Sequence, residues 1–159
     1  MRAELKDIIA RLERDGRFHM ETRYLQHGTV TVYEHSVRVA DMSLTISRRL
    51  SLRVDEESLI RGALLHDYFL YDWHEKDVSH RLHGFRHPRR ALLNAREDYT
   101  LNMVEEDIIL RHMFPLTLQP PAYKESWIVC LADKYCAAGE TLHALAGRFK
   151  GKLNHSFGA

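Results

Sequence analysis

The sequence has no long hydrophobic run, few cysteines and almost no net charge, and each absence excludes a class of protein. No uninterrupted apolar stretch approaches the roughly 20 residues that a membrane-spanning helix needs. The net charge of +1 indicates neither a nucleic acid polymer nor an anionic membrane as a partner. Cys130 and Cys136 form neither a C-x-x-C pair nor a disulfide framework, which favours a reducing, cytoplasmic location.

The sequence shows no signal-peptide pattern and no features of several domains, so we expect neither. The opening segment "MRAELKDIIARLERDG" is charged and amphipathic, without the apolar core of a signal peptide. Repeats, linkers and low-complexity tracts are absent from the sequence. Its content of 45% hydrophobic and 28% charged residues is that of an ordinary globular protein. We therefore expect a single domain over residues 1–159, and nothing in the sequence speaks against a homodimer.

Strand-type alternation is nearly absent, whereas helical spacing of apolar residues recurs along the chain. One predicted helix, with apolar residues along one face, begins at Thr31. Further helices are expected after Asp55 as an N-cap, from Pro88 as a first-turn proline, over 104–113 and through 122–149. The loop "FPLTLQPP" separates the last two. The sequence thus predicts an all-α fold, a compact single-domain helical bundle.

Histidine is the residue that the sequence has in excess. Eleven of the 159 residues are histidines, roughly three times average usage. His35 lies on an apolar helical stripe, and His66 and Asp67 end an apolar helix. His112 falls on the inward face of its helix, and Asp133 interrupts the hydrophobic run "WIVCLA". Several predicted helices therefore carry a titratable side chain towards the core.

A buried imidazole or carboxylate is costly unless it is paired, hydrogen-bonded or bound to a metal. For any one of these residues, a core polar group with its own hydrogen-bond partner is the simpler interpretation. If all of these residues were isolated core polar groups, each would need a separate hydrogen-bond partner. The set as a whole therefore indicates that these side chains converge on one site.

The segments "EHSVRVADMSLTISRRL", "GALLHDYFLYDW" and "IVCLADKY" resemble the H…HD…D signature of the HD-domain metal-dependent phosphohydrolases, over roughly residues 30–140. The HD dipeptide alone is a weak signal, but its combination with the upstream histidine and the late "LADK" is specific. The resemblance implies the all-α HD fold and four metal ligands, His35, His66, Asp67 and Asp133. Imidazole nitrogens and carboxylate oxygens suit divalent iron, manganese, zinc or magnesium.

Two further histidines bear on whether one or two ions bind. The chain is particularly similar to short bacterial HD proteins that hydrolyse dinucleoside polyphosphates, in which extra histidines hold a second ion and the HD aspartate bridges. His87 and His112 stand where those ligands are expected. Alternatively, His87 caps the helix that follows it and His112 is a core histidine. We expect the dinuclear site, whereas Met113 after His112 and the lack of a GYP motif exclude the branch that cleaves cyclic dinucleotides.

The activity that the resemblance implies is cleavage of a phosphoester or phosphoanhydride bond by metal-activated water. The substrate would be a nucleotide or a related small phosphorylated metabolite. Asp67 would act as the bridging catalytic ligand, and His83, His74 or Asp72 would protonate the leaving oxygen, unless these last three are only exposed loop residues. The candidate phosphate-binding residues, each more simply a solvated surface charge, are Lys76, Arg90, Arg111 and Lys134.

Two other classes of protein stay open. The first is a catalytically silent HD module that binds metal and nucleotide for regulation, and the second is an all-α scaffold. The complete ligand set argues against a degenerate remnant. Metal content separates the scaffold from the other two, and turnover separates enzyme from regulatory module.

Overall fold

The computed structural model describes residues 1–72 and 83–156, without the side chains of His27, His83 and residues 147–156. Its elements in chain order are α1 (Ala3–Asp15), the 3₁₀ helix η1 (Phe18–Arg23), β1 (Leu25–His27), β2 (Val30–Thr31), α2 (Val32–Arg49), α3 (Glu56–Leu65), α4 (His83–Asp98), α5 (Met103–Arg111) and α6 (Lys124–Ser156). The predicted all-α fold is confirmed, because the two strands form only a short antiparallel hairpin. Within the described part of the chain, no helix combines the length and apolar character that a membrane span requires.

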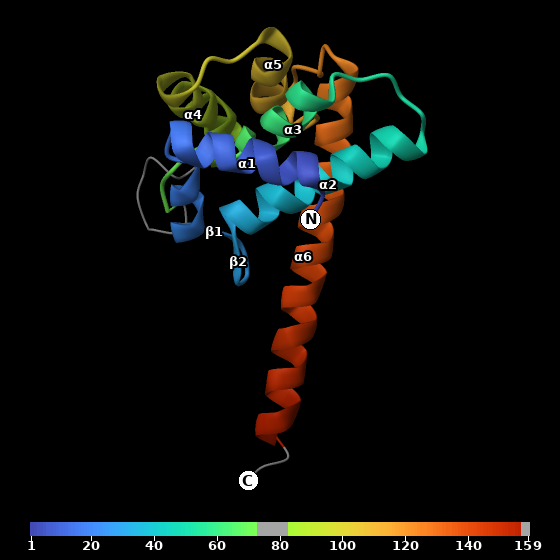
Figure 1. Cartoon of the computed structure of the whole chain (residues 1–159). Helices are drawn as coiled ribbons and strands as arrows, with labels where there is room; N and C mark the ends of the chain where they lie inside the picture. Colours follow the sequence, from blue (N-terminus) through green and yellow to red (C-terminus); the bar gives the residue numbers. More distant parts are fainter. Residues whose placement is uncertain (73–82, 157–159) are drawn as a thin grey trace.

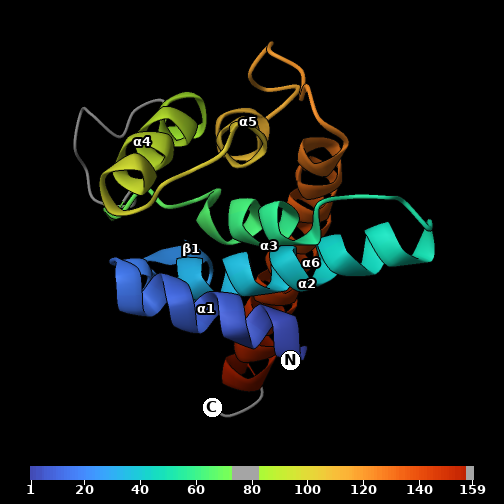
Figure 2. The same cartoon turned by 45° about the horizontal axis from the view of Figure 1, so that its top comes forward.

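Helix α3 lies in the middle of the molecule, between α2 and α5 (Figure 2). Its apolar side chains are buried around most of its circumference, as expected for a core helix. A β-carbon at Gly62 would overlap the side chain of Ile108, so the backbones of α3 and α5 approach closely. This approach brings the residues that follow the two helices, His66 and His112, into contact.

Side-chain caps define where α2 and α3 begin. Thr31 and Glu34 form a reciprocal capping box, in which each side chain accepts a hydrogen bond from the other residue's backbone N–H. The prediction that Asp55 caps α3 is confirmed, because its carboxylate accepts from the N–H groups of Glu57 and Ser58. These caps fix the helical register, and therefore the direction in which His35 and His66 point.

The prediction that Pro88 opens its helix is wrong. Helix α4 begins at His83, and Pro88 lies inside it. Proline lacks the N–H that would bond to the carbonyl of Gly84, but near a helix N-terminus this removes a single bond of the ladder. His87 is consequently an interior residue of α4 rather than a residue that caps it.

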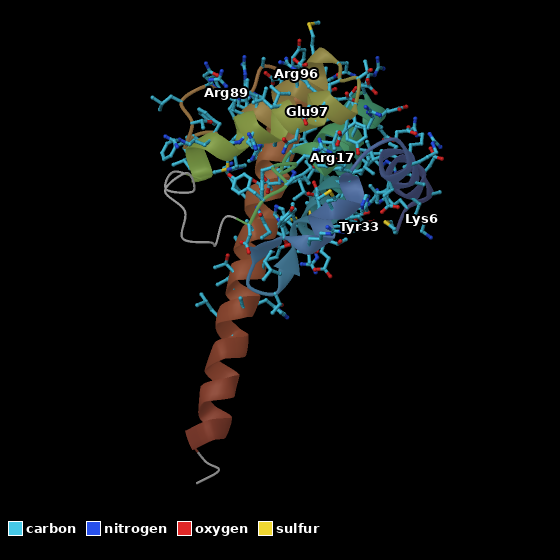
Figure 3. All side chains as sticks on the ribbon, turned by 90° about the vertical axis from the view of Figure 1, so that its left-hand side faces the viewer. Lys6, Arg17, Tyr33, Arg89, Arg96 and Glu97 are labelled. Atoms are coloured by element: carbon cyan, nitrogen blue, oxygen red, sulfur yellow. The ribbon has the colours of Figure 1, made fainter. Side chains whose placement is uncertain are left out.

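The 3₁₀ helix and the hairpin have no periodic sequence pattern and were not predicted. Gly28 at the hairpin turn has a φ of 62°, a left-handed conformation that favours glycine. Strand β1 of the hairpin carries Gln26 into the interior, where its side chain donates to Asp67. Arg17, just before η1, contacts Glu97 and Asp98 at the end of α4 and so attaches this segment to the helical body (Figure 3).

Helix α6 extends to Ser156, beyond the predicted end at residue 149. Its first half packs against α2, α3 and α5, and its second half projects away from the other helices (Figure 1). The side chains that anchor it include Ile128, Val129 and Ala132, all buried. This buried half carries Asp133 to the centre of the molecule.

Candidate metal centre

His35 on α2 and Asp133 on α6 form one side of the centre. The His35 side chain is fully buried, and its Nε2 lies 3.1 Å from Oδ1 of Asp133. Its Nδ1 lies 3.0 Å from Oε2 of Glu140, two turns further along α6. The imidazole is therefore held between two carboxylates contributed by the same helix.

His66 and His112 present equivalent nitrogens from two different helix ends. His66 donates its Nδ1–H to the carbonyl of Ala63 at 2.7 Å, and His112 donates to the carbonyl of Ile109 at 2.8 Å. In each residue the Nε2 atom is left to face the interior. The Nε2 of His66 is buried and has no hydrogen-bond partner among the residues that the structure describes.

Asp67 lies between two sets of histidines. Its Oδ2 is 3.4 Å from Nε2 of His66 and 4.0 Å from Nε2 of His35. Its Oδ1 is 3.1 Å from Nε2 of His87 and 3.6 Å from Nε2 of His112. One carboxylate oxygen thus faces each set, which is the arrangement that a bridging ligand needs.

Within the described residues, two overlapping groups offer three ligand atoms that lie within 4.8 Å of one another. The groups are His35, His66 and Asp133, and His66, Asp67 and His112. His87 adjoins the second group, with its Nε2 2.8 Å from that of His112. An unpaired buried nitrogen costs roughly 1–3 kcal/mol, and a cation at Nε2 of His66 would remove that cost. The donor set therefore fits one or two divalent cations.

The carboxylates of the centre are ionised. Burial alone would raise the pKa of Asp133, but the hydrogen bond from His35 and the charge of His66, whose Nε2 lies 3.8 Å from Oδ1 of Asp133, lower it below its usual value. Burial would also raise the pKa of Asp67, but the charge of His66 and the hydrogen bond from His87 hold it well below its usual value. Ionised carboxylates are the form that binds a cation.

The histidines differ in protonation. Burial would lower the pKa of His35, but hydrogen bonds to Asp133 and Glu140 raise it to about 10. Burial lowers the pKa of His112 to about 3, and the charges of His66 and His87 act in the same direction. His112 is therefore neutral, whereas His35 must release its Nε2 proton when a metal binds there.

Sequence reasoning missed three buried polar residues around the centre. Gln26 on β1 donates from Nε2 to Oδ2 of Asp67. The carboxyl pKa of Glu21 is well above its usual value, because the residue is fully buried and Asp67 repels its charge. Glu140 follows Asp133 by two helical turns, a spacing that could have revealed it. Glu21 and Gln26 lie in aperiodic segments and gave no comparable signal.

A cavity of about 560 Å³ opens onto the Asp67 side of the centre. Asp67, His87, His112 and Asp133 contribute to its lining, whereas His35 and His66 lie fully buried behind them. The other lining residues are mainly apolar and include Met113, Pro115, Leu116 and Ala137. A bound molecule would thus meet metal ligands on one side and an apolar wall on the other.

The cationic residues predicted to bind phosphate lie in different places. Lys134 lines the cavity, and its ammonium donates to the carbonyls of His112 and Cys130. Arg90 is exposed, one turn after His87, and does not belong to the cavity lining. Lys76 lies outside the described residues.

The structure does not bring Arg111 to the cavity. Its guanidinium binds Asp107 at 2.8 Å and the carbonyl of Pro120 at 2.9 Å. Neighbouring residues of a helix point about 100° apart, so the inward direction of His112 turns Arg111 away.

The proposed proton donors are placed only in part. Asp72 is exposed and follows Asp67 by five residues. The side chain of His83 and the whole of His74 lie outside the described residues. The assignment of a proton donor therefore stays a prediction.

Comparisons with known proteins bear on the whole arrangement. The family model described as HD domain matches residues 32–138, which include all six predicted metal ligands. Searches of curated proteins and of solved structures gave no match. The family match covers about two thirds of the chain. The chain therefore belongs to the HD-domain family of metal-dependent phosphohydrolases.

Proposed function

We propose that this protein hydrolyses a phosphoester or phosphoanhydride bond of a nucleotide or a related small phosphorylated metabolite. The observation that supports this most is the position of Asp67, which turns one oxygen to each group of histidines at the base of a cavity. The cavity volume of about 560 Å³ lies within the range of sites for small organic ligands.

A divalent cation at this centre would lower the pKa of a coordinated water towards neutrality and polarise a phosphoryl oxygen. The chain's own residues hold the metal ligands in place before a cation binds. The carbonyls of Ala63 and Ile109 fix the rings of His66 and His112, so no reorientation is needed. Asp67 and Asp133 would repel a phosphate in the metal-free protein, so phosphate binding depends on the cation.

The cavity lining supports a substrate with a charged end and an apolar part. The phosphate would lie near Asp67, His87 and His112, at the face that the cavity shares with the centre. The apolar part, such as a nucleobase, would pack on Met113 and Leu116. Lys134 would add positive charge beside the phosphate. Asp72, His83 or His74 would donate the proton to the leaving oxygen.

The test combines metal content with turnover. The full chain is purified without chelator, its metal is quantified, and hydrolysis is assayed with nucleoside monophosphates, a dinucleoside polyphosphate and a generic phosphomonoester. Asp133→Asn is expected to lose metal and turnover. Asp15→Asn is the matched control, because Asp15 is exposed and pairs only with Arg14 among the described contacts.

The outcomes separate the candidate functions. Turnover of at least one phosphate substrate, lost in Asp133→Asn and kept in Asp15→Asn, supports a hydrolase. Metal binding without turnover of any substrate supports the silent regulatory module instead. A chain that binds neither manganese nor iron after reconstitution would be a scaffold.

A further inference from the structure

Helix α6 carries an apolar surface that the rest of the described chain leaves open. Five of its residues follow one another at intervals of four, three, four and three positions; we call them the α6 seam, and they are Leu131, Tyr135, Ala138, Leu142 and Leu145. The four large side chains are 59%, 68%, 67% and 44% exposed in chain order. Monomeric proteins seldom expose contiguous apolar patches of this kind.

The seam faces away from the metal centre. Asp133 and Glu140, two turns apart on α6, contact His35 and so define the inward face of the helix. Leu131 and Tyr135 each lie two residues from Asp133, roughly 200° around the helix axis. The outward face is therefore the apolar one, the reverse of what a solvated surface helix shows.

The projecting half of α6 has little support from its own chain. Between residues 141 and 146, the last whose side chains are described, no residue is buried. The hairpin reaches this half where Gly28 lies beside Ala144 (Figure 1). A helical segment that packs against little else is marginally stable in water, so contact with a partner would stabilise this one.

The spacing of the seam favours a second copy of this helix as the partner. Intervals of four and three residues repeat every seven positions, which is the pattern of a coiled coil, in which each helix supplies both the inserted side chains and the spaces that receive them. Such a surface is complementary to a second copy of itself, and symmetric dimers are the commonest oligomers.

The apolar surface that two seams could bury against each other is large enough for a weak, specific dimer. Each large seam side chain can cover roughly 100 Å² of apolar surface. Two copies, together with Ala138 and the flanking atoms, then bury on the order of 1,000 Å², near the lower limit for specific association. We propose that the protein forms a homodimer in which the α6 seams of two copies pack against each other.

The experiment is sedimentation equilibrium of the full chain between about 1 and 100 µM. The test variant is Leu142→Glu with Leu145→Glu, which places charges in the seam. The matched control is Leu118→Glu, because Leu118 is 91% exposed and lies outside α6. We expect wild type and control to sediment at twice the mass of one chain, and the seam variant to weaken association roughly 100-fold or more.

Two results would overturn the proposal. One is a wild-type chain that stays monomeric over the whole range, and the other is a seam variant that dimerises like the control. Hydrogen exchange of wild type provides a second measurement, should the seam variant fail to fold. Amides of residues 141–146 should lose protection on dilution, and protection that is independent of concentration would also contradict the dimer.

Discussion

His66 and His112 meet edge to face in the interior, with ring centroids 4.9 Å apart and planes at 85°. Each follows the last turn of a helix and donates Nδ1–H to the carbonyl three residues before it. Two helix ends thus hold two imidazoles in the same manner and aim both Nε2 atoms at one buried space. This relationship determines what the loss of each histidine should do.

His112→Ala should remove one ion and leave the other. His112 belongs to the group with Asp67, whereas His35, His66 and Asp133 form a group without it. We expect metal content to fall from two ions per chain to one, measured by mass spectrometry of the metals after dialysis. His66→Ala should remove both ions, because His66 is shared. His19→Ala, at an exposed position, is the control. Two ions retained in His112→Ala would contradict the dinuclear centre.

Glu140→Gln should weaken metal binding without removing a ligand. Glu140 accepts a hydrogen bond from Nδ1 of His35 and is itself held by Arg38. The loss of such a supporting carboxylate costs roughly 10- to 100-fold in affinity. Calorimetric titration of the apo chain with manganese measures the change, and exposed Thr141→Ala on the same helix is the control. Equal affinities for the two variants would show that Glu140 does not support the centre.

Gly62→Ala should destabilise the fold by roughly 1–3 kcal/mol, as overpacking of a core does. The added methyl would overlap Ile108 and separate α3 from α5. Gly139→Ala is the matched control, because nothing lies within 4 Å of a β-carbon there among the described residues. Thermal unfolding in chelator compares the two, and Gly62→Ala should unfold at the lower temperature. Similar melting temperatures would argue against the close approach.

Asp98 should make stability depend on pH below neutrality. Burial would raise its pKa, but hydrogen bonds from Arg17 and Tyr68 and the charge of Arg17 lower it. A carboxyl whose pKa is lower in the folded state adds stability above its unfolded pKa, and this stability is lost as pH falls through the folded value.

The measurement is urea unfolding at a series of pH values, in chelator. Wild type should exceed Asp98→Asn by about 1 kcal/mol near neutral pH, since Arg17 is partly exposed and its contribution is screened. The difference should shrink as the pH falls to about 3. A difference that does not change with pH would assign the effect to packing instead of charge.

Local sequence patterns were enough to predict part of the fold and of the metal centre. Helical periodicity placed His35 on the inward face of α2, and the N-cap preference of aspartate located the start of α3. Two other local rules gave wrong predictions. Pro88 lies inside α4, although proline favours the first turn, because a helix tolerates one missing bond near its start. Arg111 adjoins His112 in the sequence but points elsewhere, since adjacent helical residues diverge.

The residue types of the centre and the helices that carry them could be read from the chain alone, because metal-ligand chemistry and helical periodicity are both local. Packing in three dimensions was needed to establish which oxygen of Asp67 faces which histidine, and that Gln26 reaches Asp67 from a hairpin. Packing also left one face of α6 uncovered. These relationships arise between segments far apart in the chain, such as the close approach of α3 to α5 at Gly62, and no local pattern encodes them.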